Sequence, residues 1–153
     1  MDQKIIDTVE EITSQLVSFL PLTLKVQVSP QEESVGVSIE GDDLGALIGY
    51  HGKTLSALQL FLGLAVQNKV GQWVPLLVDV GGWRTQKQES LTLLAEQVAN
   101  QVVQTGIAQQ LPYLSPTERR MVHVALTDHP QVISESEGDG EERRIVVKPR
   151  LPQ

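Results

Sequence analysis

Two groups of residues in this sequence have the types and spacing to bind phosphate, and the first is a loop with two glycines. Gly49 and Gly52 flank Tyr50 and His51, and Lys53 follows at once. Glycine lets a backbone approach a ligand closely because it has no Cβ. An apolar helical pattern starts directly after the loop, so the helix would direct its unpaired N–H groups and positive dipole end toward it. This combination suits a phosphate group.

The side chains of the loop could add to that contact. Tyr50 could stack on a base or a ribose, and His51 could donate a hydrogen bond to phosphate. Neither side chain is obligatorily charged, so Lys53 is the dependable cation of the loop. We therefore expect a weaker grip on phosphate than a loop rich in lysine or arginine would have.

The second group is an arginine–histidine pair. Arg119 and His123 are four residues apart in a helical pattern, so they share one face of the helix, and Arg120 is rotated around it. An arginine can contact phosphate with two N–H groups, and an imidazole can add a hydrogen bond or stack on a base. The alternative interpretation is a histidine satisfied in the core and an arginine paired with Glu118 or Asp128.

The glycine loop has two other interpretations. Gly52-Lys53-Thr54 matches the end of a nucleotide P-loop, but that motif needs a glycine where this chain has Leu47. A P-loop also follows a strand directly, whereas residues 44–48 have a short helical pattern. The sequence therefore argues against a phosphohydrolase. The glycines could also form nothing more than a tight turn between two helices.

Composition limits the class of protein further. The chain has 153 residues, a net charge of −7 and no cysteine, which excludes disulfides and thiolate metal sites and is typical of a reducing cytoplasm. No run of about 18 apolar residues exists, so we expect no membrane span, and the acidic N-terminal segment is unlike a signal peptide. The histidines lack a metal-binding spacing, and no serine–histidine–acid set is recognisable. We expect a soluble cytoplasmic protein that is not an enzyme and has no cofactor and no bound metal.

The negative charge is unevenly distributed. Residues 1–43 carry two lysines and nine carboxylates, a net charge of −7, so residues 44–153 are neutral overall. Residues 44–90 have a net charge of +2, which leaves room for a weakly basic face. Binding to a nucleic acid should therefore be modest and sensitive to salt.

The spacing of apolar residues predicts the elements that position both groups. Apolar residues recur in helical steps from Ile5 to Phe19, and residues 74–80 are mostly apolar, which favours an internal strand. A long helix from Trp83 to Thr105 joins two units, and Ser115 and Glu118 have the spacing of a helix-capping pair. The predicted order is a helix over 5–19, strands over 22–28 and 35–39, a short helix over 44–48, the glycine loop, a helix from 55 to about 68, a strand over 74–80, the long helix, a helix from 116 that ends before 130, and strands over 132–136 and 144–148.

The first half of this order resembles a KH domain. The stretch Leu47-Ile48-Gly49-Tyr50-His51-Gly52-Lys53-Thr54-Leu55 is similar to the KH loop, in which G-x-x-G clamps the backbone of about four nucleotides. The order αββααβ is similar to the type II, prokaryotic variant. KH loops often carry a basic residue between the glycines, where this chain has Tyr50 and His51. The resemblance implies that Ile48, Gly49, Tyr50, His51, Gly52 and Lys53 bind nucleic acid.

The second half resembles an R-three-H domain, which is named for its Arg-x-x-x-His spacing. The stretch from Leu114 to Leu126 is similar to the signature of that domain, and the stretch from Arg143 to Arg150 fits its closing strand. The domain is a small α/β unit associated with single-stranded nucleic acid. The resemblance implies that Arg119, Arg120, His123, Lys148 and Arg150 bind it.

A KH domain, a long helix and an R-three-H domain in this order are similar to the bacterial Jag (SpoIIIJ-associated, KhpB/EloR) family over roughly residues 35–150. The resemblance implies an α+β protein with a type II-like KH domain over 1–82, a connecting helix over 83–106 and the R-three-H domain over 107–153. We expect the chain to be too short for the Jag-N domain of many relatives. Roles that depend on that domain do not carry over.

The resemblance also implies a function. It predicts binding of single-stranded RNA, with single-stranded DNA left open, by a chaperone-like post-transcriptional or cell-elongation and division regulator of the bacterial cytoplasm. The expected protein partner is a small KH-only protein or a second copy of the chain. The alternative is a dimerising scaffold in which nucleic-acid binding is weak or incidental.

Overall fold

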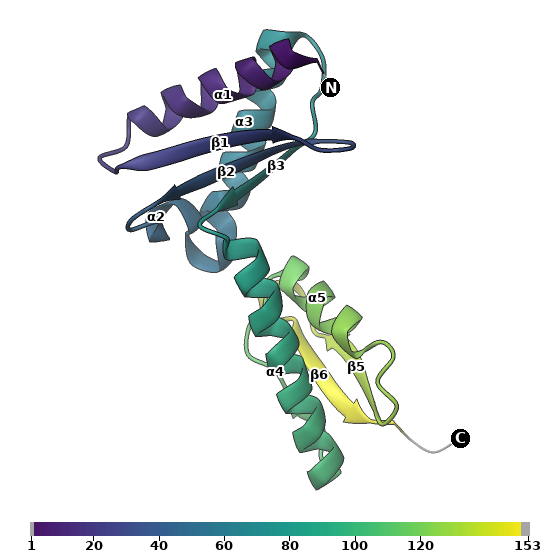
Figure 1. The fold of residues 1–153 in the computed structure, drawn as a ribbon. Helices are drawn as coiled ribbons and strands as arrows, with labels where there is room; N and C mark the ends of the chain where they lie inside the picture. The colour runs from purple at the N-terminus through teal and green to yellow at the C-terminus, as the bar shows by residue number, and fades with distance from the viewer. Residues whose placement is uncertain (1, 151–153) are drawn as a thin grey trace. The chain divides into compact units, whose positions relative to one another are not determined.

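The computed structural model describes residues 2–150 of the chain, which form two compact units divided between Arg84 and Thr85 (Figure 1). Each unit combines helices with its own three-stranded sheet, which confirms the predicted α+β class. No helix in the described part of the chain has both the length and the apolar character that a bilayer-spanning segment needs.

The first unit has a sheet with helices on one face. Strands β1 and β2 are antiparallel, β2 and β3 are parallel, and β2 lies in the middle. Helices α1 and α3 pack side by side and share a core with alternate residues of the strands (Figure 1). The elements are α1 (Gln3–Ser18), β1 (Leu24–Pro30), β2 (Val35–Gly41), α2 (Gly45–Ile48), the 3₁₀ turn η1 (Tyr50–Gly52), α3 (Lys53–Val70) and β3 (Leu76–Val80).

The expectation of an internal strand over 74–80 is wrong, because β3 is an edge strand of the sheet. Its apolar character comes from the residues on the helix side, such as Val78, whereas Leu77 on the other side is 44% exposed. The outer edge is covered by two side chains. The N–H of Val78 donates to Gln59 Oε1 at 3.0 Å, and Arg84 Nε donates to the carbonyl of Val78 at 2.8 Å.

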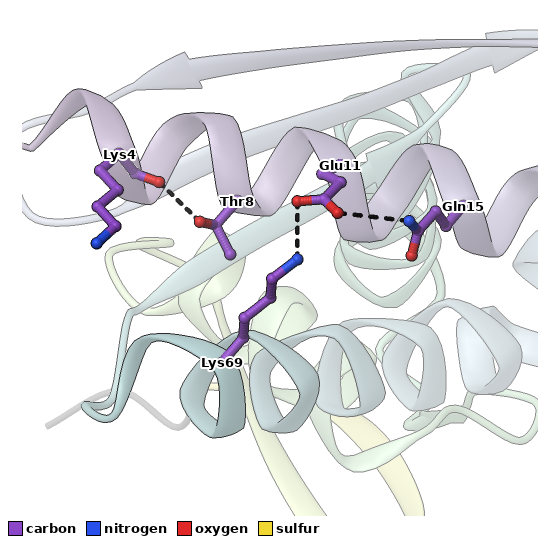
Figure 2. A network of polar contacts seen from close by, with 5 residues as sticks. All are labelled: Lys4, Thr8, Glu11, Gln15 and Lys69. Carbon is purple, nitrogen blue, oxygen red and sulfur yellow. Dashed lines mark hydrogen bonds and ion pairs between the residues drawn. The ribbon is translucent and has the colours of Figure 1, made fainter.

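Helices α1 and α3 are also joined by a polar contact at the surface. Figure 2 shows Glu11 of α1 between Lys69 of α3, whose Nζ lies 2.8 Å from Glu11 Oε2, and Gln15, which donates to the other carboxylate oxygen. An exposed pair of this kind contributes at most about 1 kcal/mol to stability. It matters more for charge, because Lys69 is one of the few basic residues between 44 and 90 and is neutralised within the unit.

In the second unit, helices α4 and α5 pack with a sheet of strand order β4-β6-β5. Leu91, Ala95, Ala99 and Val102 of α4 are buried in its core, so the apolar stripe of the long helix packs within this unit. The elements are α4 (Trp83–Thr105), β4 (Gln109–Gln110), α5 (Pro116–Leu126), β5 (Val132–Glu137), the 3₁₀ turn η2 (Gly140–Glu142) and β6 (Arg144–Pro149).

The start of α5 is anchored by a set of polar contacts. Ser115 Oγ accepts from the N–H of Glu118, and the Glu118 carboxylate accepts from the N–H of Ser115 at 2.7 Å, so the predicted capping pair is confirmed. The other carboxylate oxygen of Glu118 lies 2.7 Å from Lys87 Nζ on α4. Glu118 is buried, and this ion pair therefore fixes α5 against α4 at the first turn.

Candidate nucleic-acid interface

The loop between α2 and α3 has a backbone that demands its glycines. Gly49 has φ 71° and Gly52 has φ 75°, both in the region that favours glycine. A Cβ at Gly49 would lie 2.0 Å from Thr54 Oγ1. His51 also has a positive φ of 51°, a left-handed conformation that histidine adopts more readily than β-branched residues do. The loop is thus held in one tight shape.

The side chains of this loop form one cluster. Tyr50 is 66% exposed, its ring meets the His51 ring edge-on at a centroid distance of 4.2 Å, and Lys53 Nζ lies 5.7 Å from the Tyr50 centroid. Ile48 is half-buried against the core of the unit, so it offers the ligand backbone and only part of its side chain. An aromatic ring with an ammonium group nearby can meet a base and its phosphate together.

The loop leads directly into the N-terminus of α3. Gly52 occupies the N-cap position, and no side chain from residues 2–150 caps the helix there. The first N–H groups of a helix need partners from outside the helix, and the helix dipole favours an anion at this end. The loop thus combines a backbone that a ligand can approach closely, a helix N-terminus, and one aromatic and one cationic side chain.

The second candidate site is an open groove of about 650 Å³ between α5 and the β5–β6 hairpin. It brings together Arg119 and His123, as the helical spacing predicts, and it adds Arg120 of α5 and Arg143, which directly precedes β6. We call it the arginine groove. The lining residues are Pro116, Arg119, Arg120, His123, Ser134, Glu135, Ser136, Glu137, Arg143 and Ile145.

Neutral oxygens hold these basic groups in place. Arg119 Nη1 donates to the carbonyl of Leu114 at 2.8 Å, and Arg143 Nε donates to Ser136 Oγ at 2.6 Å. His123 Nδ1 and Ser134 Oγ are hydrogen-bonded at 2.8 Å. Contacts with neutral oxygens orient a guanidinium group without cancelling its charge.

The alternative interpretation of the arginine–histidine pair needs a histidine in the core and an acidic partner for Arg119. Glu118, one of the two acidic residues considered, is engaged by Lys87 and Ser115. His123 is exposed and not in the core.

Sequence reasoning missed Arg143 as a candidate. The signal was present in the strand alternation, because Arg143 is two residues before the buried Ile145 and so falls on the same side of the hairpin. What was lacking was the register that sets Ser136 opposite Ile145. That register brings the Ser136 hydroxyl to the guanidinium of Arg143.

Two of the predicted site residues lie elsewhere. Lys148 is two residues along the strand from Val146, on the face opposite to Ser134, and it forms ion pairs with Glu135 and Glu137. Hydrogen bonds to these carboxylates raise the pKa of Lys148. Arg150 donates to the carbonyl of His129 at 3.1 Å, at the end of the β5–β6 pair that is far from Ser136. Neither residue lines the arginine groove among the residues that the structure describes.

Comparison with known proteins supports both units separately. Residues 6–76 match the family model described as the KH domain of KhpA and KhpB, and residues 89–149 match the model of the R-three-H domain. These are the two domains that the sequence led us to expect, in the same order.

Curated relatives extend these matches along the chain. The chain is 28% identical over 147 residues to the RNA-binding protein KhpB of Clostridium symbiosum, which covers 96% of this chain and 65% of that protein. It is 33% identical over 124 residues to the RNA-binding protein KhpB of Bacillus subtilis (strain 168), covering 80% of this chain and 60% of the relative. In the protein of that name from Streptococcus pneumoniae serotype 2, the match is 31% identical and spans 35% of the relative. The chain thus spans less than two thirds of the length of these relatives.

Proposed function

This chain belongs to the KhpB-like proteins that carry a KH domain and an R-three-H domain, and we propose on that premise that it binds single-stranded RNA at two sites. The observation that carries the proposal is the arginine groove, in which Arg119, Arg120, His123 and Arg143 converge from two parts of the sequence. The relatives that share both domains are RNA-binding proteins by name. RNA is therefore the first polyanion to test, and single-stranded DNA is the second.

At the KH site, backbone groups of the protein make most of the contacts with the RNA. Gly49 and Gly52 let the sugar-phosphate chain approach the loop, and the first turn of α3 offers N–H groups to a phosphate. Tyr50 stacks on a neighbouring base or ribose, and Lys53 supplies the charge. With one lysine at the loop and Lys69 held by Glu11, this site is weak by itself.

At the R-three-H site, positively charged side chains make most of the contacts with the RNA. Arg119 and Arg143 each have N–H groups left after their contact with a neutral oxygen, and a guanidinium can hold a phosphate with two of them. His123 adds a hydrogen bond or stacks on a base. Glu135 and Glu137 at the margin of the groove reduce its attraction for RNA, although Lys148 compensates for part of their charge.

Two weak sites on one chain reinforce each other. Once RNA is held at one site, the second binding step is intramolecular and has a high effective concentration. Each site can then stay weak, so that the protein exchanges between RNAs. In this proposal the protein is a non-catalytic, chaperone-like regulator of RNA in the bacterial cytoplasm, with cell elongation and division among the processes that its targets would serve.

The test compares each site with a matched control in the full chain. Fluorescence anisotropy with a labelled single-stranded RNA measures Kd for the wild type, for His51→Asp with Lys53→Asp, for Arg119→Gln with Arg143→Gln, and for Lys25→Gln. Lys25 is an exposed lysine of β1 and serves as the control for removal of one charge. Both site variants should weaken binding, and the arginine variant should lower the slope of log Kd against log salt by about 0.7 for each phosphate that the protein no longer neutralises.

The folding of each variant is checked by its melting temperature, which should stay close to that of the wild type. If both site variants bind RNA as tightly as the Lys25 control, the proposal is wrong. If the wild type binds RNA only well below physiological ionic strength, nucleic acid is incidental to the function.

One observation favours a second candidate function, that of a dimerising scaffold. Helix α3 exposes an apolar stripe made of Leu60, Phe61 and Leu64, which are 59%, 55% and 53% exposed, and Trp73 lies beside it against Gly63. We call this the α3 stripe. Contiguous exposed apolar residues mark protein–protein contacts. We propose a second copy of the chain or a KH-only protein as its occupant. If the stripe is a dimer interface, the Leu64→Glu variant should have a mass closer to that of the monomer than the wild type has in analytical ultracentrifugation.

A further inference from the structure

Arg120 borders a second hollow as well as the arginine groove. This hollow, of about 410 Å³, lies between α4 and α5 in the same unit, and we call it the α4–α5 groove. Its lining residues are Gln88, Thr92, Thr117, Arg120, Met121, Val124 and Ala125. The two grooves share Arg120 and so adjoin across α5.

The order of residues around α5 explains why the grooves are continuous. An α-helix turns by about 100° per residue. In angular order around the exposed side of α5, Arg119 and His123 come first, Arg120 is next, and Val124 and Met121 follow. Arg119 and His123 line the arginine groove, and Val124 and Met121 line the α4–α5 groove. Arg120 therefore stands on the ridge between two flanks of one helix.

The two flanks differ in chemistry. The arginine groove is lined mostly by polar and charged residues: three arginines, a histidine, two serines and two glutamates. Of the described residues that line the α4–α5 groove, Arg120 alone carries a charge. Its floor is apolar, with Val124 64% exposed, and its walls bring an amide from Gln88 and hydroxyls from two threonines.

We propose that the α4–α5 groove binds a base of the same RNA strand whose phosphates occupy the arginine groove, with the strand crossing α5 at Arg120. This inference rests on the proposed function. A nucleobase has apolar faces and a polar edge, which match the apolar floor at Met121 and Val124 and the amide of Gln88. Arg120, on the ridge, is placed to hold the intervening phosphate.

The position of Arg120, which lines both this groove and the arginine groove, argues for a nucleotide as occupant. A free small molecule would need no arginines next to the pocket, and an apolar protein segment would gain little from a ridge that carries an arginine. A strand of RNA presents phosphates and bases alternately, which is the alternation of charge and apolar surface that the two flanks of α5 offer.

The test separates base contacts from phosphate contacts. Gln88→Ala and Val124→Ser are compared in the full chain with Arg119→Gln and with Gln97→Ala. Gln97 is an exposed glutamine of α4 outside the described lining of both grooves, so it is a matched control. Anisotropy measures Kd for a single-stranded RNA and for an abasic oligonucleotide of the same length, each over a range of salt concentrations.

If the inference is right, Gln88→Ala and Val124→Ser weaken binding of the natural RNA by about threefold to tenfold and leave the abasic Kd unchanged. The salt slope of these two variants stays that of the wild type, because every phosphate contact remains. Arg119→Gln weakens binding to both oligonucleotides and lowers the salt slope. Gln97→Ala behaves as the wild type.

The inference is overturned if Gln88→Ala and Val124→Ser bind the natural RNA like Gln97→Ala while Arg119→Gln weakens binding, a result that leaves the proposed function intact. It is also overturned if Val124→Ser changes self-association and not RNA binding, because the groove then belongs to a protein partner. A wild type that binds neither oligonucleotide at low salt contradicts the proposed function itself. Circular dichroism of both groove variants checks that the unit remains folded.

Discussion

The indole ring of Trp83 lies directly against Gly52, so that a Cβ at Gly52 would be 2.4 Å from the Cη2 atom of the ring. The second glycine of the loop is therefore required for packing as well as for the approach of a ligand. Trp83 itself packs against the core of the first unit. A change at Gly52 alters the fold and the site together, and for this reason His51 and Lys53 are the better residues for a binding test.

Gly52→Ala should lower the free energy of unfolding more than Gly71→Ala does. Both glycines have a positive φ at a helix end, but a Cβ at Gly71 would meet nothing within 4 Å. The left-handed backbone alone should cost about 1 kcal/mol, and overlap with the Trp83 ring should add roughly 1–3 kcal/mol at Gly52. Urea unfolding followed by tryptophan fluorescence measures both, and equal decreases for the two variants would show that the ring moves aside at no cost.

The left-handed backbone of His51 makes a second prediction. His51→Asn should leave stability nearly unchanged, because asparagine tolerates this region, whereas His51→Val should lower it by about 1–2 kcal/mol. The two variants remove the same imidazole, so a difference in unfolding free energy between them reports the backbone alone. Thermal unfolding of both variants at one pH is sufficient, and a valine variant as stable as the asparagine variant would argue against the left-handed conformation.

The Lys87–Glu118 pair should matter for the second unit. Lys87→Met leaves the buried carboxylate of Glu118 without its cation and should destabilise the unit by roughly 2–3 kcal/mol. Adding Glu118→Gln should recover much of that stability, since the amide oxygen can still accept from the N–H of Ser115 and no charge remains buried. Chemical denaturation of the single and double variants measures the recovery, and a double variant less stable than Lys87→Met would contradict it.

Neutralising the acidic margin of the arginine groove should strengthen RNA binding. Replacing Glu135 and Glu137 with glutamine removes two negative charges from the lining and releases Lys148 from both carboxylates. Binding should tighten by about threefold to tenfold and become more sensitive to salt. Lys148→Gln in the otherwise unchanged chain should weaken binding, because Glu135 and Glu137 lose their compensating charge. Added to the double glutamine variant it should have little effect on Kd, and a large increase in Kd there would show that Lys148 contacts the RNA directly.

The ion pairs of Lys148 also have a pH signature. The carboxylates raise the pKa of Lys148 in the folded chain, so its contribution to stability is fully present below the pKa of the unfolded chain. That contribution disappears as the pH rises through the raised pKa, above the ordinary value of 10.5. The difference in stability between wild type and Lys148→Gln should therefore be constant around neutral pH, and a difference that varies between about pH 6 and 9 would point to another titrating group.

Local spacing in the sequence predicts most of the fold, because helices and half-buried strands have distinct apolar periods. The long helix from Trp83 to Thr105, the cap at Ser115 and the hairpin near the C-terminus are all found in the structure. The strand over 74–80 is the exception. Its many apolar residues predicted an internal strand. An edge strand whose one face is buried against two helices needs nearly as many apolar residues, so composition does not distinguish the two cases.

The candidate sites were predictable only where a helix or a short loop brings the residues together. Arg119 and His123 are neighbours by helical geometry alone, and the glycine loop is contiguous. Arg143 depends on the sheet register, and the ion pairs of Lys148 depend on which residues of β5 lie beside it. The α4–α5 groove was not expected because the sequence does not show how the exposed residues of α4 and α5 lie beside one another.

The outer edge of β3 is covered at Val78, which blocks the addition of another strand at that position. An open edge strand is a template to which further chains can add one after another, and such growth has no natural end. Here Gln59 and Arg84 occupy both backbone groups of Val78 that such a neighbour would need. Self-association through the α3 stripe would instead use one helix face of each copy and stop at a pair.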